Sequence, residues 1–176
     1  MRDDMAKRQL RVIEEIVGAA TRADIDVWLR GGWAMDFSLG QVTRPHVDVD
    51  WFCWLADAER LATTLRERGY ADDQRVPPQL QLDLLKNKVE ISFAYLARND
   101  AGQVVVGAGP WTGAPFPDRM LDGSTGRLAG LTCPIISPAA QIELKQMYPV
   151  WMPERPRRLK DGEDVIQLRA AMDRRS

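Results

Sequence analysis

The chain has 176 residues, of which 45% are hydrophobic and 28% are charged, a balance typical of a globular chain rather than a disordered or membrane-embedded one. Its 24 Lys and Arg residues nearly balance its 25 Asp and Glu residues, which argues against a protein whose main task is to bind a nucleic-acid backbone. The charged N-terminus lacks the apolar run of a secretory signal, and no apolar run reaches the roughly 18 residues of a membrane span. We therefore expect a cytoplasmic protein with no membrane partner.

The few cysteines and histidines exclude several common kinds of site. Cys53 and Cys133 form no CxxC pair, so a disulfide framework and a zinc ribbon both lack their minimum parts. His46 is the single histidine, which excludes an HExxH metal site and leaves at most one base for a serine or cysteine triad. Any catalytic chemistry must therefore rest on carboxylates.

Hydrophobic periodicity predicts alternating helices and strands in the first half of the chain. Apolar residues recur at three- and four-residue spacing in the first segment, and β-branched and aromatic residues fill the segments between helices. The predicted elements are a helix over 5–23, a strand over 25–29, a tight turn at 31–32, a helix over 33–39, a strand over 47–54 and a helix over 57–69. Gly40 is the expected stop of the second helix.

The second half predicts further strands and then helices. The predicted elements are strands over 80–85 and 89–93 around a polar turn, a short strand over 103–106, a loop over 107–117, a helix from 137 and a helix over 164–172. This order predicts an α+β fold, with a mixed β-sheet, helices mainly on one face and C-terminal helices. We expect residues 1–176 to form a single domain whose C-terminal helical part spans about 137–176.

Two aspartates dominate the second predicted strand. Because side chains alternate between the two faces of a strand, Asp48 and Asp50 point the same way, while Val47 and Val49 point toward the core. Two carboxylates this close repel each other unless a cation lies between them, and oxygen ligands favour Mg²⁺ or Mn²⁺ over zinc or copper. The alternative is that both aspartates lie on an exposed edge strand and pair with arginines such as Arg44.

Two other features favour the metal-site interpretation. Gly31 and Gly32 lie between a predicted strand and a predicted helix, where exposed backbone N–H groups and the helix dipole favour a phosphate. A third carboxylate, Glu90, lies in a predicted strand whose apolar neighbours would normally exclude it. Taken alone, Glu90 fits equally well as an exposed edge residue or as a partner of Lys86 or Lys88.

Two runs of residues carry a resemblance to a known family. The run from Gly31 to Asp36 reads GGWAMD, and the run from Thr43 to Asp50 reads TRPHVDVD. Together they resemble the nucleotidyltransferase superfamily of the DNA polymerase β type, and more closely the aminoglycoside and lincosamide nucleotidyltransferases. The likeness is dense over these two runs and looser over the rest of the chain, and it implies the nucleotidyltransferase fold.

The resemblance implies metal-binding and catalytic roles for three acids. In such families the first two acids bind metal and a third from a later strand completes the site, which assigns these roles to Asp48, Asp50 and Glu90. Aspartate is the usual third acid, so the glutamate is a departure from the family pattern. Within the matched runs, Asp36 fits better as a residue that orients the turn, and His46 fits equally well as a phosphate or ligand contact and as a residue that shapes the loop.

The resemblance also implies the reaction. An acceptor hydroxyl would attack the α-phosphorus of a nucleoside triphosphate, with ATP or another NTP as the donor and Mg²⁺ or Mn²⁺ as the cofactor, and pyrophosphate would leave. Gly31, Gly32 and Arg44, with Arg30 as a further candidate, would bind the phosphates. Lys145, on the helix predicted after the loop, would reach the nucleotide, although a solvated lysine is the usual alternative.

The implied acceptor is a small hydroxyl-bearing molecule, an aminoglycoside- or lincosamide-type antibiotic. The candidate acids for a cationic acceptor are Asp118, Asp122, Glu154 and Asp161. The alternatives are a nucleotidyltransferase that acts on a protein or an RNA end, and a non-catalytic nucleotide-binding module. A second subunit of a homodimer could complete the acceptor pocket.

Overall fold

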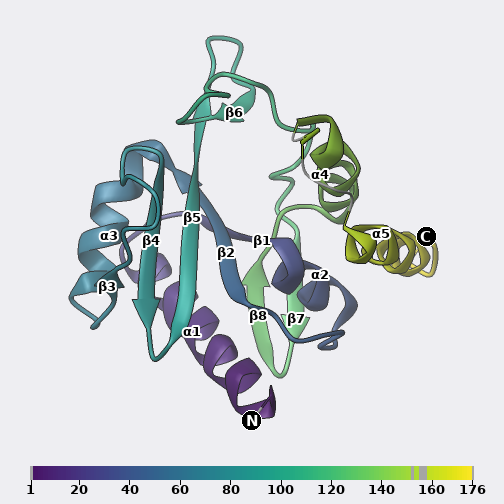
Figure 1. Ribbon diagram of the computed structural model, residues 1–176, viewed down its shortest axis with the longest axis horizontal. Coiled ribbons are helices and arrows are strands. Elements are labelled where there is room, and N and C mark those ends of the chain that lie inside the picture. The colour runs from purple at the N-terminus through teal and green to yellow at the C-terminus, as the bar shows by residue number, and fades with distance from the viewer. Residues whose placement is uncertain (1, 152, 155–157, 176) are drawn as a thin grey trace.

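The computed structural model describes residues 2–151, 153–154 and 158–175. At the centre of this part of the chain lies a six-stranded mixed sheet with the order β1-β2-β5-β4-β3, in which β6 pairs with the end of β5 (Figure 1). Only β2 and β5 run parallel, and the other strand pairs of this sheet are antiparallel. The strands are β1 Val27–Arg30, β2 Asp48–Trp54, β3 Ala71–Asp72, β4 Gln81–Lys86, β5 Val89–Arg98 and β6 Val104–Val106.

Alternation of side chains gives this sheet two different faces. Val49, Trp51 and Phe93 point to one face and are completely buried in the main hydrophobic core. Two amphipathic helices, α1 (Arg2–Arg22) and α3 (Ala58–Arg66), contact each other and supply further residues of that core. We call this the closed face, because its side chains are buried. The burial of these apolar side chains stabilises the fold.

The opposite face, which we call the open face, is divided into a polar end and an apolar end. The polar end carries Asp48, Asp50, Glu90 and Ser92. At the apolar end, Phe52 packs in a smaller core with residues of α4 (Pro138–Trp151). Ser137 caps α4, since its hydroxyl oxygen accepts a hydrogen bond from the Ala140 backbone N–H at 3.2 Å. The sheet that carries the polar end therefore packs against hydrophobic cores on both of its faces.

Helix α2 follows β1 without a connecting loop and packs beside the sheet against α4, α5 and a small β-ribbon. Gly40 ends α2 in the left-handed conformation at φ 74°, as its position predicts. No helix among the described residues has the length and apolarity needed to cross a membrane. The remaining elements are α2 Gly31–Leu39, the 3₁₀ helix η1 Leu55–Asp57, the ribbon strands β7 Thr125–Leu128 and β8 Leu131–Pro134, and α5 Leu159–Asp173.

The predicted α+β fold is confirmed, with several corrections to its elements. Helix α2 begins at Gly31 itself, so the two glycines form its first residues instead of a turn before it. Val47 precedes β2 and is 81% exposed, so the prediction that it faces the core is wrong. Strands β3, β7 and β8 were not predicted, because segments of only two to four residues carry too little periodicity.

Candidate functional site

The parallel pairing of β2 and β5 brings the predicted carboxylates to one place. Asp48 stands opposite Glu90, and Asp50 stands opposite Ser92. The Ser92 hydroxyl donates a hydrogen bond to Asp50 Oδ1 at 2.6 Å, and Arg30 Nη2 lies 3.8 Å from the same oxygen. The three acids therefore share the polar end of the open face, although they come from strands that are far apart in the sequence.

The electrostatics of this group fit a cation. Burial is the largest cause that raises the pKa of Asp48 above its ordinary value, and the charges of Asp50 and Glu90 raise it further. Arg30 and Arg75 act in the opposite direction but do not cancel the rise in pKa. A hard divalent cation would relieve this repulsion, so the donor set suits Mg²⁺ or Mn²⁺.

Glu90 is engaged by a residue that the sequence analysis did not consider. Arg75 Nη1 donates a hydrogen bond to Glu90 Oε2 at 2.6 Å, and Arg75 Nε lies 2.7 Å from Asp73 Oδ2. In the part of the chain that the structure describes, no three His, Cys, Asp or Glu side chains are arranged to hold a metal ion. The role of Glu90 as a metal ligand beside Asp48 and Asp50 therefore stays a prediction.

The two predicted phosphate-binding glycines allow close approaches at the start of α2. Gly31 has φ +70°, and a Cβ atom on it would lie 3.1 Å from Asp50 Oδ2. A Cβ atom on Gly32 would lie 2.4 Å from His46 Nδ1 and 3.5 Å from Arg44 Nη2. The N-terminus of this helix thus lies next to both a carboxylate and a guanidinium group. Its backbone N–H groups and dipole favour an anion such as a phosphate.

Asp36 and His46 fix the loop that leads from α2 to β2. Asp36 is completely buried, and its Oδ1 accepts a hydrogen bond from Thr43 Oγ1 at 2.6 Å. Its Oδ2 lies 2.6 Å from His46 Nε2, and the His46 carbonyl accepts a hydrogen bond from Gln9 Nε2 at 3.1 Å. Of the two roles considered for each residue, these contacts favour shaping the loop over touching a substrate.

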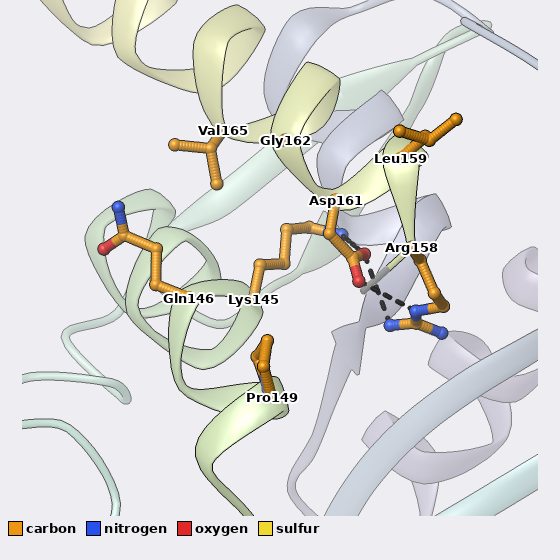
Figure 2. A pocket seen from close by; sticks show the side chains of 8 residues that line it. All are labelled: Lys145, Gln146, Pro149, Arg158, Leu159, Asp161, Gly162 and Val165. Carbon is orange, nitrogen blue, oxygen red and sulfur yellow. Dashed lines mark hydrogen bonds and ion pairs between the residues drawn. The ribbon is translucent and has the colours of Figure 1, made fainter. Parts of the chain in front are cut away.

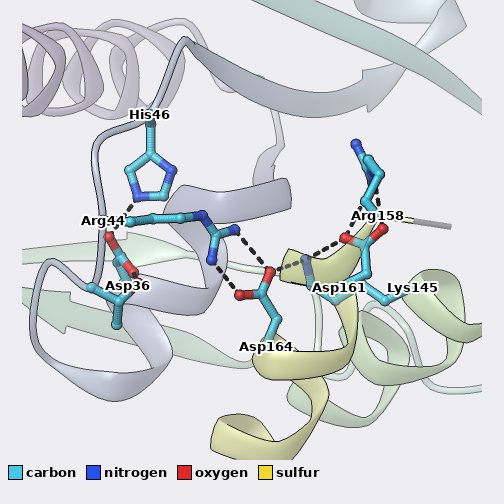
Figure 3. Close-up of polar contacts among 8 residues, drawn as sticks. Asp36, Arg44, His46, Lys145, Arg158, Asp161 and Asp164 are labelled. Atoms are coloured by element: carbon cyan, nitrogen blue, oxygen red, sulfur yellow. Dashed lines mark hydrogen bonds and ion pairs between the residues drawn. The ribbon is translucent and has the colours of Figure 1, made fainter. Parts of the chain in front are cut away.

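Arg44 and Lys145 converge on Asp164, a residue of α5 that the sequence analysis missed (Figure 3). Both terminal nitrogens of Arg44 donate to the Asp164 carboxylate, with Nη2 at 2.8 Å from Oδ2, and Lys145 Nζ donates to Oδ2 at 2.8 Å. Lys145 Nζ also lies 3.8 Å from Asp161 Oδ1. Because an aspartate on a polar helix usually faces solvent, the sequence offered no signal that Asp164 is completely buried.

The charges around Asp164 stabilise one another. Burial by itself would raise the pKa of Asp164, but the hydrogen bonds from Arg44 and Lys145 outweigh burial and lower the pKa below its ordinary value. The hydrogen bond to Asp164 likewise raises the pKa of Arg44. Asp164 therefore favours the charged form of Arg44 beside Gly32, and the contact of Arg44 and Lys145 with phosphates stays a prediction.

Comparisons with known proteins identify the family to which the chain belongs. The family model described as aminoglycoside-2''-adenylyltransferase matches residues 12–159. The match covers most of the chain and includes the three acids, the two glycines, Arg44 and Lys145. The chain belongs to this family. The resemblance to aminoglycoside nucleotidyltransferases that the two motif runs predict is thereby confirmed.

Individual relatives match this chain over a short segment with high sequence identity. The 2''-aminoglycoside nucleotidyltransferases of Klebsiella pneumoniae and Escherichia coli are each 44% identical to the chain over 46 residues. These 46 residues make up 26% of this chain and 26% of each relative, so the matched segment spans about a quarter of the curated proteins.

Solved structures show the same fold along nearly the whole chain. The lincosamide antibiotic adenylyltransferase LnuA, bound to lincomycin, has a TM-score of 0.68 at 21% identity. The matched region covers 89% of this chain and 94% of the LnuA chain. ANT(2'')-Ia in complex with adenylyl-2''-tobramycin has a TM-score of 0.64 at 20% identity and covers 96% of this chain and 99% of its own. At this identity the likeness establishes the fold alone.

A pocket of about 490 Å³ lies between α4 and α5 of this family member (Figure 2). Lys145 and Pro149 line it from α4, and Asp161 and Val165 line it from α5. Arg158 Nε donates to Asp161 Oδ2 at 2.8 Å at the pocket wall. None of the three acids on the open face lines this pocket, so its size does not make it the reaction centre.

The four acids considered for a cationic acceptor differ in burial and in their partners. Asp161 is buried and bonded to Arg158, whereas Asp118, Asp122 and Glu154 are exposed. Asp122 accepts hydrogen bonds within its own loop from Ser124. The acid that does lie beside the carboxylates of the open face is Asp83, which stands opposite Ser92 across the β4–β5 pair.

Proposed function

We propose that the chain transfers the nucleoside monophosphate of a nucleoside triphosphate, with ATP as the donor, to a hydroxyl group of a small acceptor. The observation that carries this proposal is the grouping of Asp48, Asp50 and Glu90 beside the glycine-rich start of α2. Acids outnumber cations there, and a triphosphate with its divalent cations would complete the site. Membership of an adenylyltransferase family supports the reaction class.

Each acid has a proposed role at the transferred phosphate. Asp48, Asp50 and Glu90 would hold Mg²⁺ or Mn²⁺, which when bound supplies positive charge at the reacting phosphate. Ser92 fixes the orientation of Asp50 through its hydrogen bond. Glu90 accepts the proton of the acceptor hydroxyl while the new bond to the α-phosphorus forms and the bond to the pyrophosphate oxygen breaks. Arg75 must release Glu90 for this step.

The start of α2 is the proposed site for the phosphates. Gly31 and Gly32 present backbone N–H groups at the helix N-terminus without a side chain in the way. The Arg44 guanidinium lies beside Gly32, where its N–H groups that do not bind Asp164 can donate to phosphate oxygens. Lys145 adds a second positive charge, and Asp164 holds both cations in position.

The proposed acceptor is an aminoglycoside- or lincosamide-type antibiotic. The curated relatives are named for 2''-aminoglycosides, and the two solved neighbours contain lincomycin or adenylylated tobramycin. A net charge of −1 also fits a small acceptor better than a nucleic acid. We further propose that the chain acts as a single domain in the cytoplasm, where ATP is supplied.

The decisive experiment measures donor binding before any acceptor is chosen. ATP and GTP are titrated calorimetrically with Mg²⁺ into the native chain and into Asp48→Asn/Asp50→Asn. We expect Mg²⁺-dependent binding by the native chain and a loss of on the order of a hundredfold or more in the double variant. The matched control is Asp26→Asn/Asp100→Asn, which removes two exposed carboxylates and should bind as the native chain does.

Product formation then tests the transfer itself. The native chain with MgATP should convert tobramycin or lincomycin into an adenylylated product and pyrophosphate, both detectable by mass spectrometry. Nucleotide binding without any adenylylated product would favour the non-catalytic nucleotide-binding module. No binding of either nucleotide by the native chain would falsify the proposed function.

A further inference from the structure

The acidic part of the open face extends beyond the three acids of the proposed reaction. Asp83 on β4 stands opposite Ser92, and therefore in the same row as Asp50. Asp73 follows β3, and its backbone N–H donates to the Asp83 carbonyl at 2.9 Å. The carboxylates thus continue from β2 across β5 and β4 toward the edge strand β3.

Asp83 has an oxygen atom that needs a hydrogen-bond donor. The residue is 5% exposed, and its Oδ1 accepts a hydrogen bond from Gln81 Nε2 at 2.6 Å. Its Oδ2 is buried and has no hydrogen-bond partner among the residues that the structure describes. A buried carboxylate oxygen without a donor costs free energy, so such an atom in a native fold calls for a specific reason. Binding of a cationic ligand group is one such reason.

Arg75 already places a cation in this region. It lies in the loop after β3, and its Nη1 reaches Glu90 Oε2 on β5 at 2.6 Å. Because β4 lies between β3 and β5, the Arg75 side chain must cross β4 on the open face. Its side chain and that of Glu90 are 40% and 42% exposed, and ion pairs this exposed are weak. An external cation can therefore replace the guanidinium group.

The position of Asp83 separates it from Asp48 and Asp50, the two proposed metal ligands on β2. Neighbouring strands lie about 4.8 Å apart, so β4 lies about 10 Å from β2 and from the carboxylate of Asp50. Asp83 is, however, on the strand next to Glu90, on the side away from the start of α2. An acceptor that reaches Glu90 from this side lies over β5 and β4, and so within reach of Asp83.

We propose that Asp83, with Asp73 at its rim, binds an ammonium group of the acceptor, and that this ammonium group displaces Arg75 from Asp73 and Glu90. The inference rests on the proposed function, because it takes Glu90 as the residue that faces the reacting hydroxyl. It makes Asp83 a specificity-determining residue. The chain then prefers an acceptor with several ammonium groups, such as tobramycin, over lincomycin, which carries a single amine.

The test measures tobramycin binding by calorimetry at low salt, without nucleotide or metal. Asp83→Asn preserves the shape of the side chain and removes its charge, and we expect about ten- to a hundredfold weaker binding. Arg75→Gln removes the internal cation, and we expect about two- to fivefold tighter binding. Asp100→Asn removes one charge from an exposed turn and should leave the affinity unchanged. Thermal melting checks that each variant is folded.

The opposite signs of the two effects distinguish a subsite from a structural role. Equal affinities of the native chain and Asp83→Asn would overturn the subsite, as would weaker binding by Arg75→Gln. If Asp83→Asn does not fold, the Arg75→Gln result decides alone. A native chain that binds MgATP but no tobramycin would overturn the subsite and leave the donor part of the proposed function intact. Tobramycin binding that depends on Asp83, without MgATP binding, would support the subsite and contradict the proposed function.

Discussion

The acids of the open face and the residues around Asp164 are both clusters of charge, but the pKa values of Asp48 and Asp164 are shifted in opposite directions. Asp48 lies close to other carboxylates, and burial together with their charges raises its pKa. Asp164 is completely buried, yet its pKa is lowered, because the hydrogen bonds from Arg44 and Lys145 outweigh burial. The pKa of an aspartate is therefore raised on the open face and lowered in the cluster around Asp164.

We interpret this difference as one between charges that join parts of the fold and charges that we propose bind a ligand. Around Asp164 the carboxylate binds two cations and joins the loop after α2 to α4 and α5. On the open face the acids repel one another, and the N-terminus of α2, which favours anions, begins next to Asp50. We therefore place the proposed reaction centre at these acids instead of in the pocket between α4 and α5.

The largest expected effect on stability comes from Asp164→Asn. The substitution leaves Arg44 and Lys145 without their buried counter-ion, and we expect the free energy of unfolding to fall by about 3–5 kcal/mol. Urea unfolding measures the change. The control Asp72→Asn breaks an exposed pair with Arg66 and should cost less than about 1 kcal/mol. Equal losses in the two variants would contradict a structural role for the Asp164 cluster.

A smaller effect is expected from Gly31→Ala, which acts on the open-face site. Alanine at φ +70° is strained, and its Cβ would lie 3.1 Å from Asp50 Oδ2, so we expect a loss of about 1–3 kcal/mol in the free energy of unfolding. Weaker binding of MgATP should accompany it. Gly162→Ala, on α5 with no atom near the added Cβ, should instead stabilise the chain by about 0.5–1 kcal/mol. Unfolding curves that rank the two variants in the reverse order would refute the close approach at Gly31.

The smallest expected effect is a dependence of stability on pH. The folded-state pKa of Asp164 lies below its unfolded-state value of about 3.9, so its ionised form stabilises the fold above that value. This contribution is lost as the pH falls through the folded-state pKa. The difference in unfolding free energy between the native chain and Asp164→Asn should therefore be constant near neutral pH and shrink below about pH 4. Urea unfolding across this range checks it, and a difference that grows on acidification would have the wrong sign.

Local patterns in the sequence were sufficient to predict part of the candidate site. The two-residue spacing of Asp48 and Asp50 places both on one face of any strand, whatever packs around it. Gly40 ends a helix because glycine adopts the left-handed backbone conformation without steric strain. Glu90 was found from its apolar neighbours, but its position opposite Asp48 depends on the parallel pairing of β2 and β5, which no local pattern predicts.

By itself, the sequence determined the fold class, the family and the acids of the candidate site, because these follow from periodicity and from motif runs within short segments. Only the tertiary structure decided which charges face one another. It paired Arg44 and Lys145 with Asp164, placed Arg75 on Glu90, and left an oxygen of Asp83 without a partner among the described residues. The physical reason is that charge balance is a sum over neighbours, and here the neighbours come from distant strands, helices and loops.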